Sequence, residues 1–332
     1  MTETSDHRQR KRAGLVSVAV AVALLLAKYQ AYRLTGSTAV LSDALESIVN
    51  VIAALFAVFG LFVAAAPADR NHPYGHGKIE YFAAAFEGGL IAFAAVLIVR
   101  EAILALLADN EIQQLDLGVL ITVLAGLANA GLGVYLTRVG RRTNSLTLIA
   151  DGKHVLADFW TSVGVVVGLG LVALTGQRWL DPVAAILVAC WLLWTGVKLV
   201  REAAGGLLDE EDPAFTRHVV ATFDGYLGQG VIRLHHLRTI RAGHFHHISA
   251  HLVVPEFWTV ERAHELAEHV ASRLIKDLEH EGEVTFHTDP CHRAYCRMCD
   301  VEACSVRTHA FAGRPTMLVE EAVRPDPPRW TP

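Results

Sequence analysis

Six long apolar stretches between residues 14 and 203 constrain the fold of this chain more than any other feature of its sequence. A helix needs about 20 mostly apolar residues to cross the hydrocarbon core of a bilayer, and each stretch is close to that length or longer. Hydrophobic residues make up 52% of the chain and charged residues only 19%, an apolar balance that is unusual for a soluble protein. We therefore predict six helices that span a lipid bilayer, at Gly14–Tyr32, Ser37–Ala66, Ile79–Leu107, Leu115–Leu136, Leu146–Thr175 and Pro182–Val200.

The lysine and arginine residues between these stretches predict how the helices are oriented. Basic residues gather in the N-terminal tail, in the loops at 69–78 and 138–142, and at the exit near 198–201. The three other connectors carry only Arg33 and Arg178. Because short loops rich in lysine and arginine stay in the cytoplasm, we expect both termini to be cytoplasmic, in a protein of the cytoplasmic (inner) membrane.

Beyond residue 204 the sequence is typical of a soluble domain, and this part holds 13 of the 17 histidines. Its pattern predicts the order helix, strand, strand, helix, strand, which suits a small α+β domain with an open antiparallel sheet. The net charge of -5 gives no reason to expect nucleic acid as a partner. The predicted helices are Pro213–Leu227 and Val260–His280, and the predicted strands are Leu234–Arg241, His246–Val254 and Val284–Thr288.

These features divide the chain into four parts. We predict a cytosolic N-terminal tail at 1–13, a six-helix transmembrane domain at 14–203 and a cytosolic metal-binding domain at 204–290. Residues 291–332 form a cysteine-rich segment and a C-terminal tail, which we expect to be disordered because it is rich in proline near its end.

Polar groups interrupt two of the predicted helices at the same depth. Glu46 and Asn50 lie four residues apart in the second helix, and His154 and Asp158 lie four apart in the fifth, so each pair projects from one helix face. At about 1.5 Å per residue, nine residues from either helix start reach roughly the middle of a ~30 Å core. Ionisable groups at that depth cost about 2.5–3.5 kcal/mol each, so they need a function or a partner. We predict that the four side chains form one transport site for a tetrahedral divalent cation, and interhelical hydrogen bonds without a ligand are the alternative.

The charges of this site favour an exchange of metal for protons. Glu46 and Asp158 contribute two negative charges, whereas Asn50 and neutral His154 contribute none, so a divalent cation makes the site neutral. Two protons, for example one on His154 and one on a carboxylate, give the same net charge and compete for the same lone pairs. Histidine titrates near neutral pH, so it is suited to exchange a proton for a metal ion.

Four cysteines follow the predicted soluble domain with the spacing C-x4-C-x2-C-x4-C, at Cys291, Cys296, Cys299 and Cys304. In a reducing cytosol, four cysteines within fourteen residues indicate a metal site rather than disulfides. A structural zinc site with four thiolates is our first interpretation. An iron–sulfur cluster is a less favoured one because plant-type clusters take their fourth cysteine from far along the chain, and unligated thiols are a third possibility.

Five motifs that follow one another along the chain resemble those of the cation diffusion facilitator family, over roughly residues 14 to 290. The motifs are LSDALESIVNV (Leu41–Val51), HPYGHGKIEYF (His72–Phe82), DGKHVLADFWTSVGV (Asp151–Val165), LHHLRT (Leu234–Thr239) and FHTDP (Phe286–Pro290). The resemblance implies a homodimer with six transmembrane helices per protomer and a cytosolic ferredoxin-like α+β domain.

The resemblance also implies three metal sites in this sequence. The resemblance makes zinc the leading substrate. Glu46 and Asn50 depart from the zinc-type pattern of the family, which has aspartate or histidine at these places, so iron, manganese, cobalt and cadmium are alternatives. The implied sites are a transport site (Glu46, Asn50, His154, Asp158), a loop site (Asp69, His72, His76) and a cytosolic regulatory site (His235, His251, His264, His287, Asp289). We expect four other histidines to be surface or turn residues: His236, His244, His246 and His247.

Two rival functions remain at this point. A membrane-bound metalloenzyme would need a catalytic motif such as H-E-x-x-H, which the chain lacks, so we expect a secondary active transporter rather than an enzyme. A metal or redox sensor built on the four cysteines would use the helices only as an anchor. An anchor has no need for carboxylates at mid-bilayer, so the sequence favours the transporter.

Overall fold

The computed structural model describes residues 5–35, 38–107, 116–177 and 179–325. The chain forms two compact units, residues 1–208 and 209–332.

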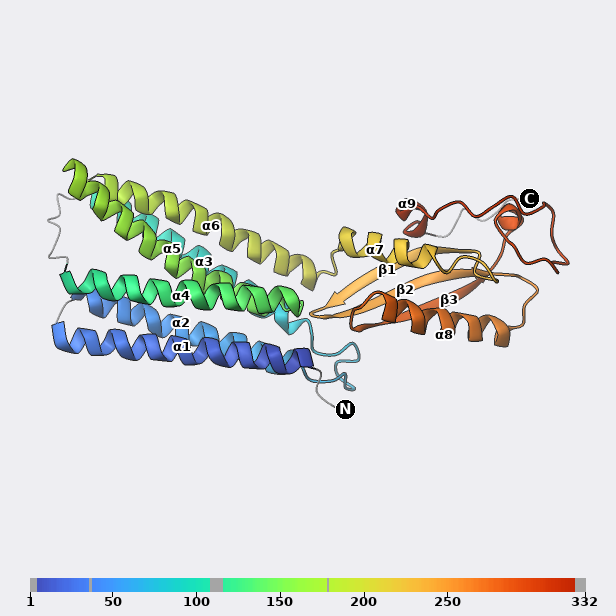
Figure 1. The fold of residues 1–332 in the computed structure, drawn as a ribbon, viewed down its shortest axis with the longest axis horizontal. Helices are drawn as coiled ribbons and strands as arrows, with labels where there is room; N and C mark the ends of the chain where they lie inside the picture. Colours follow the sequence, from blue (N-terminus) through green and yellow to red (C-terminus); the bar gives the residue numbers. More distant parts are fainter. Residues whose placement is uncertain (1–4, 36–37, 108–115, 178, 326–332) are drawn as a thin grey trace. The chain divides into compact units, whose positions relative to one another are not determined.

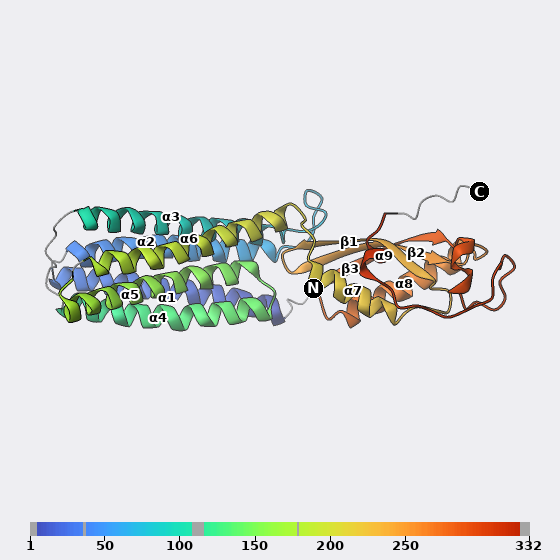
Figure 2. The same ribbon diagram turned by 90° about the horizontal axis from the view of Figure 1, so that it is seen from above.

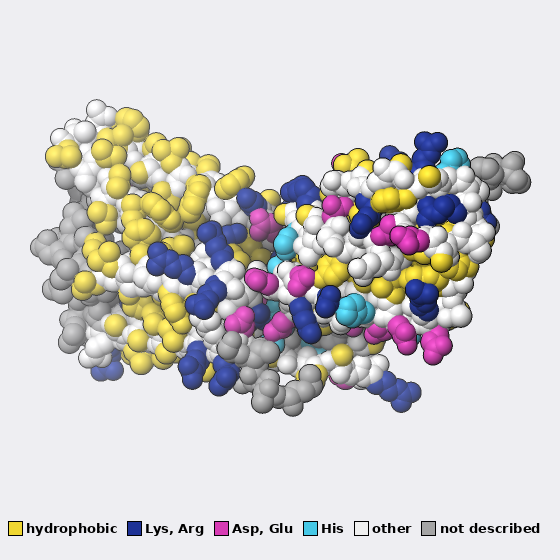
Figure 3. Space-filling model, turned by 45° about the vertical axis from the view of Figure 1, so that its right-hand side comes forward, with side chains coloured by type: hydrophobic (Ala, Val, Ile, Leu, Met, Phe, Trp, Pro, Cys, Tyr) yellow, Lys and Arg dark blue, Asp and Glu magenta, His cyan; other side chains and the backbone are white. Residues whose placement is uncertain are grey.

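The first unit is a bundle of long helices (Figures 1 and 2). Six of its described helices are long and apolar enough to cross a membrane, which confirms the predicted helical membrane fold. Hydrophobic side chains cover much of the visible surface of this unit (Figure 3), as expected where lipid surrounds a protein. The helices are α1 (Ser5–Thr35), α2 (Thr38–Ala64), α3 (Ile79–Leu107), α4 (Asp116–Arg142), α5 (Leu146–Thr175) and α6 (Leu180–Leu207).

Small residues let pairs of these helices approach closely. A Cβ atom added to Gly88 on α3 would lie 2.9 Å from the backbone oxygen of Gly196 on α6, so neither position has room for a larger side chain. A Cβ atom at Gly152 on α5 would likewise lie 2.9 Å from the backbone oxygen of Gly133 on α4. Such contacts between glycines are a common way to pack membrane helices, and here they fix the positions of α3 and α5.

The second unit contains α7 (Pro213–Asp224), β1 (Arg233–Ala242), β2 (Phe245–Val254), α8 (Val260–Asp277) and β3 (Gly282–Pro290). The sheet order is β1-β2-β3, and both helices contribute to one hydrophobic core on the same face of the sheet (Figure 2). This arrangement confirms the predicted small α+β domain.

The predicted antiparallel sheet is wrong in one pair of strands. β1 and β2 are antiparallel, but β2 and β3 are parallel. The helix α8 connects β2 to β3 and returns the chain to the same end of the sheet, so the sheet is mixed.

The segment after β3 folds back onto the second unit. It contains a short 3-10 helix, Arg293–Arg297, and a single-turn helix, α9 (Val319–Ala322). Met317 is buried in the core of the unit, and its backbone N–H donates to Asp224 Oδ1 over 2.8 Å. The region for which we expect disorder lies mostly beyond residue 325, outside the described residues.

Candidate metal sites

The structure brings residues of α2 and α5 together inside the helical unit. Asn50 Nδ2 donates to Asp158 Oδ2 over 2.6 Å, and Asn50 Oδ1 lies 3.3 Å from His154 Nε2. His154 is buried, while Asn50 and Asp158 are partly buried. Three of the four residues of the predicted transport site therefore form one connected group.

The fourth residue of this predicted site, Glu46, belongs to α2, but its side chain lies outside the described part of the structure. Among the described side chains of the predicted site, Asn50 is therefore the one that α2 contributes to the contact with α5. The donors that it assembles, a carboxylate oxygen, an amide oxygen and an imidazole nitrogen, suit a divalent transition metal.

Two further carboxylates lie near His154, and one of them was missed in the sequence. Glu87 on α3 is fully buried, and its Oε2 lies 3.5 Å from His154 Nδ1. Asp151 on α5, three residues before His154, is also buried. A carboxylate in the middle of an apolar stretch is itself a signal, so Glu87 could have been singled out from the sequence, although not its partner.

A small cavity adjoins the group formed by Asn50, His154 and Asp158. Residues of α1, α2, α4 and α5 line it, and they include Lys28 and Asn129. The polar lining gives a cation or water several oxygen and nitrogen partners within an otherwise apolar bundle.

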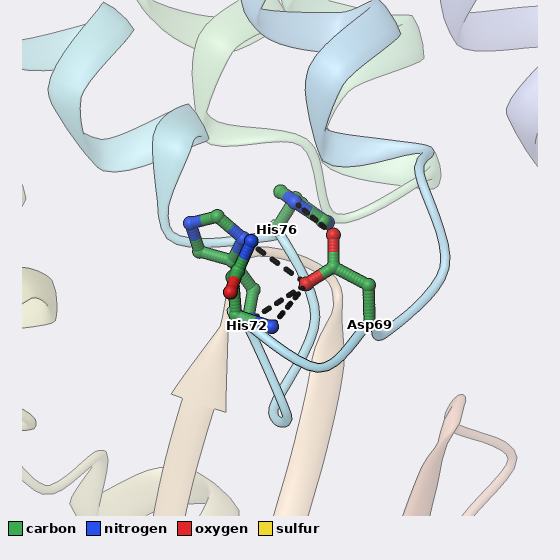
Figure 4. A network of polar contacts seen from close by, with 4 residues as sticks. Asp69, His72 and His76 are labelled. Atoms are coloured by element: carbon green, nitrogen blue, oxygen red, sulfur yellow. Dashed lines mark hydrogen bonds and ion pairs between the residues drawn. The ribbon is translucent and has the colours of Figure 1, made fainter.

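The loop between α2 and α3 places Asp69, His72 and His76 around one point (Figure 4). Their ligand atoms all lie within 4.8 Å of one another. His72 Nδ1 lies 3.3 Å from Asp69 Oδ1, and His76 Nε2 lies 3.5 Å from Asp69 Oδ2. Hydrogen bonds from the backbone N–H groups of His72 and Asn71 hold the pKa of Asp69 below its ordinary value. An ionised carboxylate beside two imidazoles is a donor set that fits a divalent metal.

The sheet of the second unit assembles a larger histidine group. His235, His251 and His287 stand opposite one another in the register of the three strands. Each contacts the carboxylate of Asp289: His235 Nε2 at 3.1 Å, His251 Nδ1 at 3.0 Å and His287 Nε2 at 3.2 Å. One carboxylate that meets three imidazoles is a strong donor set for a transition metal.

The remaining residue predicted for this group, His264, lies on α8 with an exposed side chain. No contact among the described residues joins it to His235, His251, His287 or Asp289. Its role as a ligand therefore remains a prediction.

The expectation that His246 is a surface or turn residue is wrong, whereas His244 lies in the turn between β1 and β2, as expected. Both side chains are buried, and the ring of His246 lies 4.2 Å from that of Phe215 between ring centroids. Burial, followed by the nearby charge of Arg241, lowers the pKa of His246 to about 4. This histidine is therefore a neutral core residue near pH 7.

The four cysteines occupy an ordered segment with Cys296 and Cys299 buried. Arg307 donates to the backbone oxygens of Cys296 (3.2 Å), Cys299 (3.0 Å) and Val301 (2.6 Å), and Thr308 Oγ1 donates to Cys296 Sγ over 3.5 Å. Burial raises the pKa of Cys296, but the hydrogen bonds from Thr308 outweigh it and leave the pKa below its ordinary value. The four thiols are not among the described groups of ligands that lie within 4.8 Å of one another, so the four-cysteine zinc site remains a prediction.

The six long apolar helices are typical of an integral membrane protein, and comparisons with known proteins identify its family. Residues 14–208 match the family model of the cation efflux transmembrane domain, and residues 212–291 match that of the cation efflux protein cytoplasmic domain. The chain belongs to the cation efflux family, which confirms the resemblance to cation diffusion facilitators.

Curated relatives extend over most of the chain. It is 41% identical over 277 residues to the "Uncharacterized transporter sll1263" of Synechocystis sp., a match that covers 83% of this chain and 89% of the relative. It is 30% identical over 294 residues to the "Cation-efflux pump FieF" of Shewanella oneidensis, with 87% and 97% covered. The protein of the same name from Klebsiella pneumoniae is 29% identical over 286 residues, with 86% and 94% covered.

Proposed function

We propose that this protein exports a divalent transition-metal cation from the cytoplasm in exchange for protons, and that zinc is its preferred substrate. The observation that carries the proposal is the contact between Asn50, His154 and Asp158 inside the helical unit. Polar groups inside a membrane bundle cost free energy, so they are expected to serve a function. An amide, an imidazole and a carboxylate are groups that can bind a metal ion. The name of the FieF relatives, cation-efflux pump, supports the direction of transport.

The two nitrogens of His154 give a physical basis for proton exchange. Nε2 faces Asn50 Oδ1, and Nδ1 faces Glu87 Oε2, so both nitrogens face acceptor oxygens. A histidine with a proton on each nitrogen fits these surroundings when metal is absent. A cation that binds Nε2 has to displace the proton on that nitrogen, so uptake of metal from the cytoplasm releases a proton.

The cytosolic group of His235, His251, His287 and Asp289 is proposed to bind metal as a regulatory site. Its donors fit zinc because a single carboxylate already holds the imidazole nitrogens at short distances. We propose that the protein is a homodimer, and that occupation of this site draws the two cytosolic domains together and favours transport. The loop group of Asp69, His72 and His76 is proposed as a third metal site.

Flux measurements on the full chain in proteoliposomes test the transport proposal. We expect Zn²⁺ to enter faster than Fe²⁺, Mn²⁺, Co²⁺ or Cd²⁺, and an imposed proton gradient to change the rate. His154→Ala and Asp158→Ala abolish the flux, whereas Glu101→Gln, at an exposed position on α3, leaves it unchanged. Flux that persisted without His154 and Asp158 would contradict the transport site, and flux that ignored the proton gradient would contradict antiport.

A further inference from the structure

The helix α3 presents two carboxylates on the face that it buries in the bundle. Glu80, Ala84, Glu87, Ile91 and Ala95 are all buried, and their spacing of three or four residues places them along one side of the helix. Burying an apolar side chain at either acidic position would cost less free energy than burying a carboxylate. Each carboxylate is therefore expected to have a partner or a function.

Glu80 has a structural reason. Its Oε2 accepts from Ser145 Oγ at 2.5 Å and from the backbone N–H of Thr147 at 3.5 Å. Ser145 is the N-cap of α5, so Glu80 ties α3 to the first turn of that helix. Carboxylates are stabilised at this end of a helix by its dipole.

Glu87, two turns further along, has no such partners. It is fully buried, and no hydrogen-bond donor among the described residues reaches either oxygen of its carboxylate. The group that faces it at ion-pair distance is the imidazole of His154, with Nδ1 3.5 Å from Oε2. Hydrogen bonds around a binding site are often long before the ligand arrives and shorten once it is bound.

The backbone next to Glu87 is held firmly in place. Gly88 packs against Gly196 on α6, and a Cβ atom at Gly88 would lie 2.9 Å from the backbone oxygen of Gly196 and 3.1 Å from the Cβ atom of Leu199. Because α3 cannot slide at this crossing without a clash, the backbone of Glu87 keeps its position relative to α6.

We propose that Glu87 is a positioning residue for transport: it accepts a hydrogen bond from Nδ1 of His154 and keeps Nε2 directed at Asn50 and Asp158. The inference rests on the proposed function, because it assumes that Nε2 is the atom that binds the cation. A histidine that binds a metal usually donates its other N–H to a carboxylate or carbonyl, which fixes the ring and its tautomer. Loss of such a partner typically weakens metal binding by ~10–100-fold.

Two substitutions of Glu87 by residues of similar size test whether its role is to accept a hydrogen bond from His154. Glu87→Leu removes the acceptor, whereas Glu87→Gln keeps an oxygen that can accept from Nδ1–H. We expect Glu87→Leu to raise the KM for Zn²⁺ flux by ~10–100-fold with little change in the maximal rate, and Glu87→Gln to raise it much less. Glu101→Gln, an exposed carboxylate on the same helix, serves as the matched control and leaves KM unchanged.

Three results would overturn the inference while the transport function stands. The first is an unchanged KM in Glu87→Leu when His154→Ala abolishes flux. The second is an equal increase in the KM for Zn²⁺ in Glu87→Leu and Glu87→Gln, which would make the negative charge of Glu87 the important property. The third is a lower maximal rate at constant KM, which indicates loss of folded protein. If the wild-type chain moves none of the five cations, both the proposed function and this inference are wrong.

Asp151 provides one more discriminating variant because it is the other buried carboxylate near His154. If Asp151→Asn raises the KM for Zn²⁺ strongly and Glu87→Leu does not, then Asp151 positions the ring instead of Glu87. The inference expects the opposite order.

Discussion

Asn50 on α2 and Asp158 on α5 are joined by a hydrogen bond of 2.6 Å between Nδ2 and Oδ2, across 108 residues of sequence. The same amide directs its Oδ1 to His154 Nε2 at 3.3 Å. An amide can donate to one neighbour and accept from another, which an ionised carboxylate cannot do. Asn50 therefore connects His154 and Asp158 of α5 without adding a charge to the group.

Removal of this amide is expected to disable transport. Asn50→Leu keeps a similar volume but loses both contacts, so we expect Zn²⁺ flux to fall by at least ~10-fold. Asn50→Asp keeps one oxygen, replaces the amide nitrogen with a second oxygen and adds a charge beside Asp158. We therefore expect it to retain flux with a changed order of preference among the five cations. Initial rates in proteoliposomes measure both effects, and wild-type flux in Asn50→Leu would show that the amide has no part in transport.

Asp289 is expected to be the most important residue of the proposed cytosolic metal site. It contacts three histidines, so Asp289→Asn removes the charge that their nitrogens share. We expect it to weaken zinc binding there by at least ~10-fold and to abolish the dependence of transport on cytosolic metal. Zinc content after equilibrium dialysis of the full chain is the measurement. His264→Ala is the control, since the described contacts leave His264 apart, and a loss of zinc as large as that in Asp289→Asn would return His264 to the ligand set.

Much of the membrane fold could be predicted because the length of each apolar stretch largely determines where a membrane helix begins and ends. The predicted and observed bounds agree for α3 and α5, where long apolar stretches end at polar loops. The pairing of α2 with α5 was also accessible, because Asn50, His154 and Asp158 stand out against apolar surroundings at matching depth. Sequence spacing within one helix indicates which side chains share a face.

Relationships between distant segments were harder to predict. The direction of β3 depends on where α8 places the chain, and strand patterns alone do not contain that information. Nothing in the sequence of α3 indicates the partner of Glu87, so its proximity to His154 follows only from helix packing. The burial of His246 could have been predicted from the sequence. It lies two and four residues before Ile248 and Ala250, so all three side chains are on the same buried face of β2.

The cysteine segment is expected to bind one metal ion through thiolates. Its backbone is already organised by Arg307 and Thr308, although the four sulfurs have to move closer together to share an ion. In the Co²⁺-loaded chain we expect a thiolate-to-metal absorption band that disappears in Cys296→Ser/Cys299→Ser, with the loss of one metal equivalent. Cys190→Ser, the matched control in α6, keeps the band. Bound iron with acid-labile sulfide in the purified protein would point to the iron–sulfur alternative instead.

Acid is expected to destabilise the second unit, residues 209–332, through His246. Its pKa is about 4 in the folded protein and about 6.5 in an unfolded chain, so between these values the unfolded state binds the proton more readily. Stability is therefore unaffected by this group above pH ~6.5 and falls as the pH drops towards 4, by up to ~3 kcal/mol. The urea midpoint of the second unit, followed by pulse proteolysis of the full chain at several pH values, measures the effect. His246→Phe, which preserves a ring against Phe215, should flatten this part of the pH dependence, while His269→Phe at an exposed position of α8 should not. An unchanged slope in His246→Phe would mean that other groups cause the loss of stability in acid.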